Sequence, residues 1–157
     1  MLDPETWIKG WRGESSVKKL LRELEPLGYR IVNHLDIGHG DVDHVVVGPS
    51  GVFAIETKNH AGHFARSGSS LTKNGYPADD ILDQAIGEAA TVRKGTGVRW
   101  VEAVVVVPTG SVEGARLSFA KATVVDNDGL LPHITGRGQQ LDPSDVERIA
   151  QLLERVR

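Results

Sequence analysis

Residues 40–59 read GDVDHVVVGPSGVFAIETKN, and this stretch decides the fold. Its two apolar runs are separated by Gly-Pro-Ser-Gly, a composition typical of a tight turn. The stretch therefore predicts a β-hairpin with strands over residues 43–47 and 52–58. An aspartate and a Glu-x-Lys tripeptide stand at the far ends of these strands, where charged groups are unfavourable to bury unless something uses them.

The register of the hairpin follows from its turn. A two-residue or four-residue loop pairs Gly48 with Gly51, and counting outward places Asp43 opposite Glu56. Directly opposed residues share a face, with Cβ atoms about 4.5–5.5 Å apart, and Lys58 projects from that face two residues later. We therefore expect these three charged side chains to converge. An odd loop or a bulge would shift the register by one residue, and the apolar pattern does not exclude this shift.

This convergence indicates a chemistry. Two opposed carboxylates repel unless a cation lies between them. Oxygen ligands favour Mg²⁺ or Mn²⁺ over zinc, and such an ion binds phosphate and lowers the pKa of a bound water. Lys58 on the same face could orient the nucleophile or stabilise negative charge developing on phosphorus. The pattern indicates metal-assisted phosphodiester hydrolysis. The alternative is a surface salt bridge between Lys58 and Glu56, because Glu-x-Lys tripeptides are common.

The rest of the chain predicts further helices and strands. Apolar residues at helical spacing predict helices over 14–24, 80–94 and from 142 onward, with a brief helical turn at 130–134. Continuous apolar runs predict strands over 29–35, 101–107 and 122–125. The polar, glycine-rich segment 59–79 predicts a loop or an irregular hairpin, and its length suggests a functional role. Because no repeat or linker is present, we expect a single α/β domain over residues 1–157.

Composition excludes several classes of protein. The 157 residues contain no cysteine, which rules out disulfides, zinc–thiolate sites and thiol catalysis. The first residues lack the features of a signal peptide, and no apolar run reaches membrane-spanning length, so we expect a soluble, cytoplasmic protein without a membrane partner. The net charge of −3 is not typical of a nucleic-acid-binding protein, although carboxylates gathered for metal binding lower the total.

Basic residues near the predicted site are candidates for phosphate contacts. Four surround the start of the first helix and two lie in the glycine-rich segment. Taken alone, each is better explained as a solvated surface residue. The candidates are Lys9, Arg12, Lys18, Lys19, Arg66 and Lys73.

Five of the six histidines lie between His34 and His63. The spacing His60-x-x-His63 allows a metal-binding pair, but a polar surface role is favoured because one pair lacks the usual three or four ligands. His44 is adjacent to Asp43 in a strand, so it should point to the opposite face.

The motifs resemble those of the nuclease-related domain, or NERD, family within the PD-(D/E)xK nuclease superfamily. The resemblance extends over about residues 10–95 and rests on four motifs: Gly13-Glu14-x-x-Val17, Asp43-His44-Val45-Val46-Val47, Gly51-Val52-Phe53-Ala54-Ile55-Glu56-Thr57-Lys58-Asn59 with Gly62 beyond it, and Gln84-Ala85. The chain differs in lacking a tryptophan before the second helix, and it has Ile81-Leu82-Asp83 where the family has an Asn-Pro pair.

The resemblance implies roles for five residues. Glu14, Asp43 and Glu56 would surround Mg²⁺ or Mn²⁺, Lys58 would be the catalytic lysine, and Gln84 would support the site. From the residues alone, Glu14 is equally an acid in the first turn of a helix, where the helix dipole favours it. The implied fold is restriction-endonuclease-like, a mixed β-sheet with a central hairpin and helices on both faces.

Three functional hypotheses follow. The first is a Mg²⁺- or Mn²⁺-dependent nuclease that acts on DNA rather than RNA. The second is a non-catalytic module that keeps the fold and binds nucleic acid or protein, and the third is a metal-dependent hydrolase of a small phosphodiester. The sequence is compatible with a homo-oligomer and does not distinguish endonuclease from exonuclease action.

Overall fold

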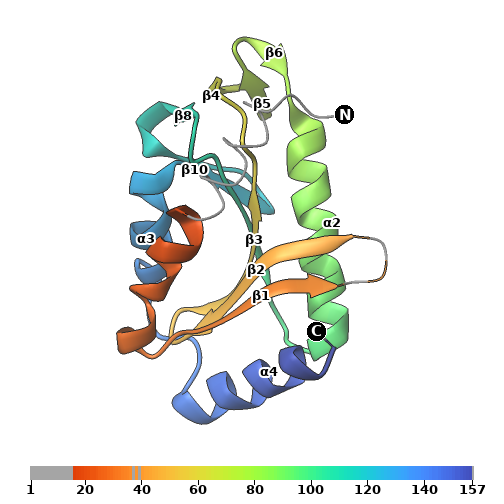
Figure 1. Cartoon of the computed structure of the whole chain (residues 1–157). Helices are drawn as coiled ribbons and strands as arrows, with labels where there is room; N and C mark the ends of the chain where they lie inside the picture. The colour runs from red at the N-terminus through yellow and green to blue at the C-terminus, as the bar shows by residue number, and fades with distance from the viewer. Residues whose placement is uncertain (1–15, 37, 39, 157) are drawn as a thin grey trace.

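The computed structural model describes residues 16–36, 38 and 40–156, and Figure 1 shows a β-sheet with helices around it. Residues 16–22 are the described part of the first helix. The strands are β1 (Arg30–Asp36), β2 (Asp41–Gly48), β3 (Gly51–Thr57), β4 (His63–Ser67), β5 (Ser70–Lys73), β6 (Tyr76–Pro77), β7 (Glu102–Val106), β8 (Ser111–Val112), β9 (Arg116–Ser118) and β10 (Ala122–Val125). The helices are α2 (Asp79–Thr96), α3 (Asn127–Thr135) and α4 (Pro143–Val156), with 3₁₀ turns η1 (Glu25–Leu27) and η2 (Glu113–Ala115).

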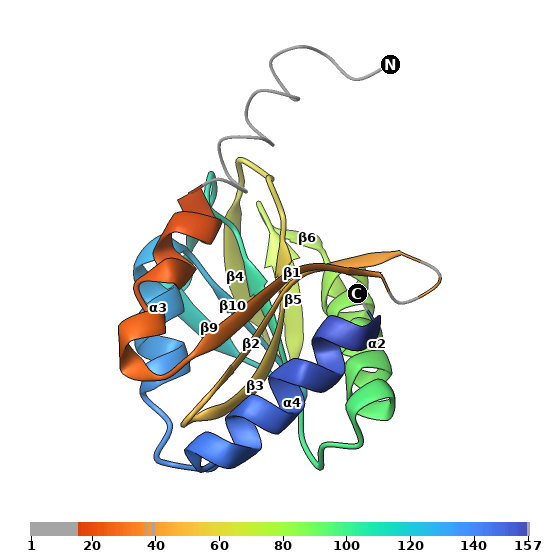
Figure 2. The same cartoon turned by 60° about the horizontal axis from the view of Figure 1, so that its bottom comes forward.

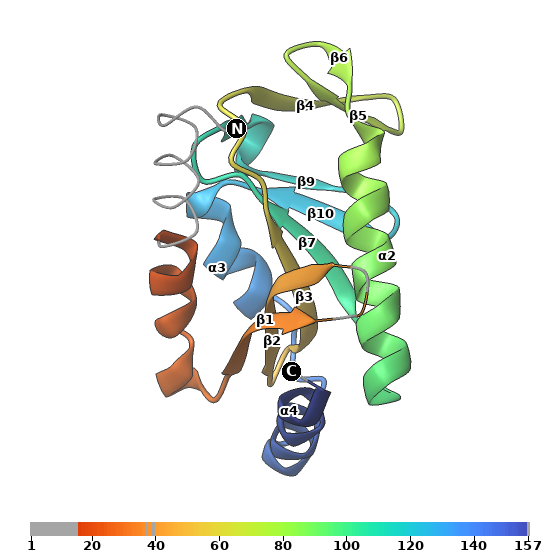
Figure 3. The ribbon, with the colours of Figure 1, turned by 45° about the vertical axis from the view of Figure 1, so that its right-hand side comes forward.

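The main sheet is mixed and has the strand order β1-β2-β3-β7-β10-β9. Strand β7 is parallel to both β3 and β10, whereas β1, β2 and β3 form an antiparallel meander. All five residues of β7 are buried, as expected for a continuous apolar run in a central strand. Helix α2 covers one face and α3 the other, and α4 packs on β1 and β2 (Figures 2 and 3). The expected mixed sheet flanked by helices is confirmed.

The hairpin register is also confirmed. Gly48 pairs with Gly51, and the ladder between β2 and β3 runs to the pair of His44 with Ile55. Beyond this pair, the N–H of Thr57 donates to a side chain and not to the backbone of β2: its acceptor is the Asp43 Oδ2, at 2.8 Å. The two strands therefore separate at the position where the predicted charged residues stand.

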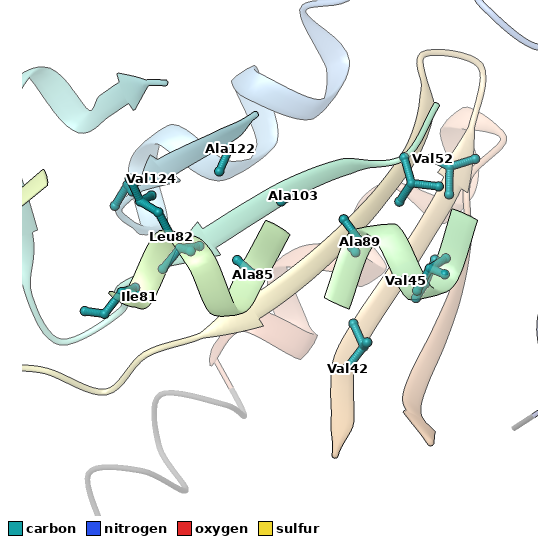
Figure 4. Packing of buried hydrophobic residues seen from close by; sticks show 14 of the residues in the cluster. Val42, Val45, Val52, Ile81, Leu82, Ala85, Ala89, Ala103, Ala122 and Val124 are labelled. Carbon is teal, nitrogen blue, oxygen red and sulfur yellow. The ribbon is translucent and has the colours of Figure 1, made fainter. Parts of the chain in front are cut away.

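The core lies in two clusters, one on each face of the sheet. On the α2 face, Ile81 and Leu82 pack at the start of the inner side of the helix, and the small residues Ala85 and Ala89 follow (Figure 4). Ala85 and Ala89 are buried there and belong to the same cluster as Val45 and Ala103 of the sheet. The predicted inward orientation of α2 is confirmed, since Ile81, Ala85, Ala89 and Val92 are all buried.

Segment 59–79, predicted to be a loop or an irregular hairpin, contains a hairpin, because β4 and β5 pair antiparallel. With β6 and β8 these strands form a separate four-stranded sheet near the start of α2 (Figure 1). One segment differs from the sequence prediction. Helix α3 is longer than the predicted turn at 130–134, because the Asp126 carboxylate accepts the N–H of Gly129 and caps the helix three residues earlier. Among the described residues, no helix is both long enough and apolar enough to cross a bilayer.

Candidate active site

The strand ends bring Asp43, Glu56 and Lys58 to the face of the sheet that α2 covers. Alternation along β3 places Glu56, and Lys58 two residues later, on the same side as buried Ala54, which belongs to the core cluster beneath α2. The Asp43 carboxylate lies near them, since it accepts the N–H of Thr57 and its charge acts on Glu56. The Lys58 Nζ lies 4.0 Å from the Glu56 Oε1. The backbone of Lys58 is held by the neighbouring strand, since its N–H donates to Val106 O at 2.9 Å.

Helix α2 supplies Gln84 to the same site. The Gln84 Oε1 accepts a hydrogen bond from the Lys58 Nζ at 2.7 Å. Gln84 reaches this position although the residues before it, Ile81-Leu82-Asp83, depart from the family pattern. Ile81 and Leu82 are themselves buried on the inner side of α2, where they help to fix the helix against the sheet.

Glu88, which the sequence patterns did not single out, completes the group. The Gln84 Nε2 donates to the Glu88 Oε1 at 3.2 Å, and the Glu88 carboxyl also interacts with that of Glu56. A signal was available, since residues four apart on a helix lie on one face and Glu88 follows Gln84 by one turn. Its proximity to β3 depends on how α2 packs, which the spacing alone does not give.

Glu56 lies in an electrostatically unfavourable environment. The residue is 8% exposed, and its Oε2 is buried without a hydrogen-bond partner among the described residues. Burial and a hydrogen bond with Glu88 raise the pKa of Glu56 to about 9. The negative charges of Asp43 and Glu88 act in the same direction, and the positive charge of Lys58 acts against them. The carboxyl therefore holds a proton at neutral pH unless a cation replaces that proton.

These donors fit a hard divalent cation. Mg²⁺ is commonly bound through one or two carboxylates, with waters and substrate phosphate completing its ligands, and Asp43 and Glu56 supply such a pair. Within residues 16–36, 38 and 40–156, no three His, Cys, Asp or Glu side chains are grouped closely enough to hold a metal without further ligands. The remaining expected ligand, Glu14, lies outside the described residues.

The predicted phosphate-binding residues differ in their surroundings. Lys9 and Arg12 lie outside the described residues, while Lys18 and Lys19 are exposed on the first helix. Arg66 is exposed on β4, with its guanidinium 4.2 Å from the centre of the Phe119 ring and donating to the Ser118 carbonyl. Its side chain is thus held by contacts with the end of β9 and the residue that follows it.

Lys73 is half-buried and packs against the backbone at Gly62, where an added Cβ would come within 2.9 Å of the lysine Cε. His63 is bonded through Nδ1 to the Ser111 Oγ at 2.8 Å. His60 is half-buried, and burial lowers its pKa, so it is neutral at pH 7. Because neither histidine belongs to a group of three metal-binding side chains within the described ranges, these contacts do not support the His60–His63 metal pair.

His44 points away from the acidic group, as expected from its place beside Asp43. It is fully buried on the other face of the sheet, with Nδ1 2.7 Å from the Asn33 Oδ1. Burial lowers its pKa to about 4, with the nearby His34 and Lys18 contributing in the same direction. His44 is therefore a neutral structural residue.

Comparison with protein families gives one match of direct relevance. The family described as "Nuclease-related domain" matches residues 9–108 of this chain. The matched segment contains the acidic residues, the lysine and the glutamine that form the site.

Two individual proteins are similar to parts of the chain. An uncharacterized protein of Bacillus anthracis is 39% identical over 59 residues, which cover 34% of this chain and 28% of that protein. The crystal structure of a repair endonuclease from Pyrococcus abyssi superposes with a TM-score of 0.41 and 18% identity, covering 83% of this chain and 47% of the other. The aligned parts thus span under a third of the Bacillus protein and about half of the endonuclease.

Proposed function

Because this chain belongs to the nuclease-related domain family, we propose that it is a metal-dependent nuclease that hydrolyses phosphodiester bonds in DNA. The observation that carries the proposal is the site at the end of the hairpin. There, Asp43 and Lys58 lie beside the buried Glu56 carboxyl, whose pKa is raised by burial and by its acidic neighbours more than Lys58 lowers it.

Asp43 and Glu56 would hold Mg²⁺ or Mn²⁺, together with Glu14 as the family resemblance implies. When bound, such an ion activates a water and neutralises charge on the phosphate. In the reaction, the water oxygen bonds to phosphorus, the bond from phosphorus to the leaving oxygen breaks, and a proton is transferred to that oxygen.

Lys58 has a role of its own in this scheme. Its ammonium group is fixed between Gln84 and Glu56, at 2.7 Å from the amide oxygen and 4.0 Å from the carboxylate. A positive charge held in this way needs little reorganisation to stabilise the oxygens on which negative charge develops. Gln84 supports the reaction by orienting that charge.

DNA as the substrate is supported by family membership and by exposed basic side chains. Lys18 and Lys19 are exposed on the first helix, where they can contact the phosphate backbone. These contacts are independent of base sequence, so we expect binding that weakens as the salt concentration rises.

The direct test incubates the purified chain with supercoiled plasmid and with linear DNA, in Mn²⁺, in Mg²⁺ and in EDTA. We expect cleavage only with metal, and we expect Glu56→Ala and Asp43→Asn to abolish it. Cleavage that persists in EDTA, or that is unchanged in Glu56→Ala, would contradict the proposal. A panel of nucleotides and small diesters in the same assay distinguishes a nuclease from a hydrolase of small phosphodiesters.

The net charge of −3 favours a second candidate, a non-catalytic binding module. In that case the wild type cleaves nothing, and Asp43→Asn and Lys58→Ala leave binding to DNA or to a protein partner unchanged. A gel-shift assay on the same variants decides between the two functions.

A further inference from the structure

Glu88 is the acidic residue of this site to which neither the family motifs nor the reaction assigns a role. It is half-buried on α2, one turn after Gln84 and on the same side of the helix. The buried residues Ala85 and Ala89 fix this side of α2 against the sheet, so the orientation of Glu88 toward β3 is set by the core.

The amide of Gln84 has two ends with opposite hydrogen-bonding character. Its oxygen accepts from the Lys58 Nζ at 2.7 Å, and its nitrogen donates to the Glu88 Oε1 at 3.2 Å. A carboxylate only accepts and an ammonium group only donates, so these two partners are compatible with one orientation of the amide. A rotation of the amide by half a turn would place the NH₂ against the ammonium and the oxygen against the carboxylate.

We propose that Glu88 is a positioning residue of the active site, which fixes the Gln84 amide so that its oxygen holds the Lys58 ammonium beside Glu56. This inference rests on the proposed nuclease function, which it deepens. Glu88 acts through Gln84 and does not contact the substrate.

The contact between Glu88 and Glu56 strengthens the inference. Glu56, Lys58, Gln84 and Glu88 form a closed ring in which each side chain interacts with the next. Loss of Glu88 removes the carboxylate that accepts from the Gln84 nitrogen, so the amide is no longer restricted to one orientation. Lys58 would then lose a fixed acceptor on its α2 side.

The first test compares three variants in steady-state cleavage of DNA. Glu88→Leu removes the acceptor, Glu88→Gln keeps an oxygen that can accept from Gln84, and Asp83→Asn removes an exposed carboxylate from the same helix. We expect Glu88→Leu to lower kcat by about 10- to 100-fold with KM unchanged, because misplacement of a catalytic group acts on the reaction and not on binding. Glu88→Gln should restore most of this loss, and Asp83→Asn should match the wild type.

A double-mutant cycle then identifies the path of the effect. If Glu88 acts through Gln84, then Gln84→Leu lowers kcat to the level of Glu88→Leu, and the double variant is no worse than either single variant. Effects that multiply in the double variant would overturn the proposal, as would a Glu88→Leu variant with wild-type kcat.

A second readout does not depend on cleavage. In the metal-free protein, the side-chain NH₂ signal of Gln84 is assigned by its absence from the NMR spectrum of Gln84→Leu. We expect this signal to shift in Glu88→Leu and to stay in place in Asp83→Asn. Absence of wild-type cleavage would overturn the proposed function but not this test, whereas an unshifted Gln84 signal in Glu88→Leu would overturn the positioning role of Glu88.

Discussion

Glu56 and Glu102 are both buried glutamates on neighbouring strands of one sheet, but their pKa values shift in opposite directions. Glu56 interacts with Glu88 of α2, and Glu102 interacts with His133 of α3. These two helices lie on opposite sides of the sheet, so each glutamate has its own environment (Figure 3). They are 8% and 5% exposed, and each has an Oε2 buried without a partner among the described residues. Burial therefore does not account for the difference.

The neighbours of Glu102 stabilise its charge. Its Oε1 accepts hydrogen bonds from His133 at 3.1 Å, Arg137 at 2.9 Å and Thr123 at 3.3 Å. Burial raises the pKa of Glu102, but the hydrogen bond and charge of His133, with Arg137, outweigh burial and lower it. The chain itself thus supplies the positive charge that this carboxylate needs.

The neighbours of Glu56 do the reverse. Asp43 and Glu88 add negative charge, and Lys58 at 4.0 Å is the nearby cation. A buried carboxylate that the protein leaves undercompensated is a candidate for binding an external cation. Glu102 therefore stabilises the folded protein. Glu56 destabilises it as long as no cation compensates its charge.

The largest difference between the two glutamates should be in how their substitution affects cleavage activity. We expect Glu56→Ala to lower metal-dependent DNA cleavage by about 1,000-fold, since it removes a ligand of the group that stabilises transition-state charge. Glu102→Gln should keep the wild-type kcat per folded molecule. Single-turnover cleavage at saturating Mn²⁺ measures both, and equal losses in the two variants would mean that Glu56 has no role beyond structure.

The Glu56 site and Glu102 should also differ in their contribution to metal binding. At a Mn²⁺ concentration about 100 times its Kd, the free energy of unfolding should rise by about 2.7 kcal/mol in the wild type. Asp43→Asn should lose this increase, although the asparagine oxygen can still accept the N–H of Thr57 and preserve the strand end. Chemical denaturation with and without Mn²⁺ measures the effect, and Glu102→Gln, which should keep the full increase, is the control.

In the absence of metal, substitution of Glu102 should lower the free energy of unfolding more than substitution of Glu56 does. Glu102→Gln should lower the free energy of unfolding by about 2 kcal/mol, because it weakens charge-assisted hydrogen bonds in a buried group. Glu56→Gln should change it by less than about 1 kcal/mol at pH 7, since the amide resembles the protonated carboxyl already present. Denaturant titrations in EDTA provide the measurement, and a larger loss in Glu56→Gln would contradict the assigned protonation state.

The dependence of stability on pH should carry opposite signs at the two sites. Between about pH 4.5 and 9, folded Glu56 keeps a proton that the unfolded chain has released, so stability falls as pH rises. The slope should reach at most about 1.4 kcal/mol per pH unit in EDTA and vanish in Glu56→Gln. Glu102, whose pKa is lowered, contributes stability that is lost as pH falls through its folded pKa. Unfolding curves from pH 4.5 to 9 test Glu56, and a slope retained in Glu56→Gln would assign it to another group. Curves extended below pH 4.5 test Glu102.

Local sequence signals were sufficient to predict the hairpin and the positions of its charged residues. The Gly48–Gly51 turn fixes the pairing, so the positions of Asp43, Glu56 and Lys58 follow from counting residues along the two strands. Such counting works because strand pairing next to a tight turn is local.

The surroundings of the two glutamates depend on contacts between residues far apart in the chain. His133 and Arg137 lie 31 and 35 residues after Glu102, and no periodicity indicates that they meet. Glu88 has the right spacing from Gln84, but its approach to Glu56 depends on the packing of α2 against the sheet. The short strands β4, β5 and β6 allowed only the open prediction of a loop or an irregular hairpin, because each is only two to five residues long.

Substitutions at different positions of the core should have unequal consequences, and the small buried residues Ala85 and Ala89 are the sensitive positions. Both are buried between α2 and the sheet, so the size of their side chains limits how closely this part of the helix approaches the strands (Figure 4). A larger side chain at either position would lift the glutamine and its acidic neighbour away from the lysine without altering a single polar group. The positions of the reacting side chains therefore depend on residues that do not contact the substrate. Substitutions in the interior of the protein can change the geometry of the site.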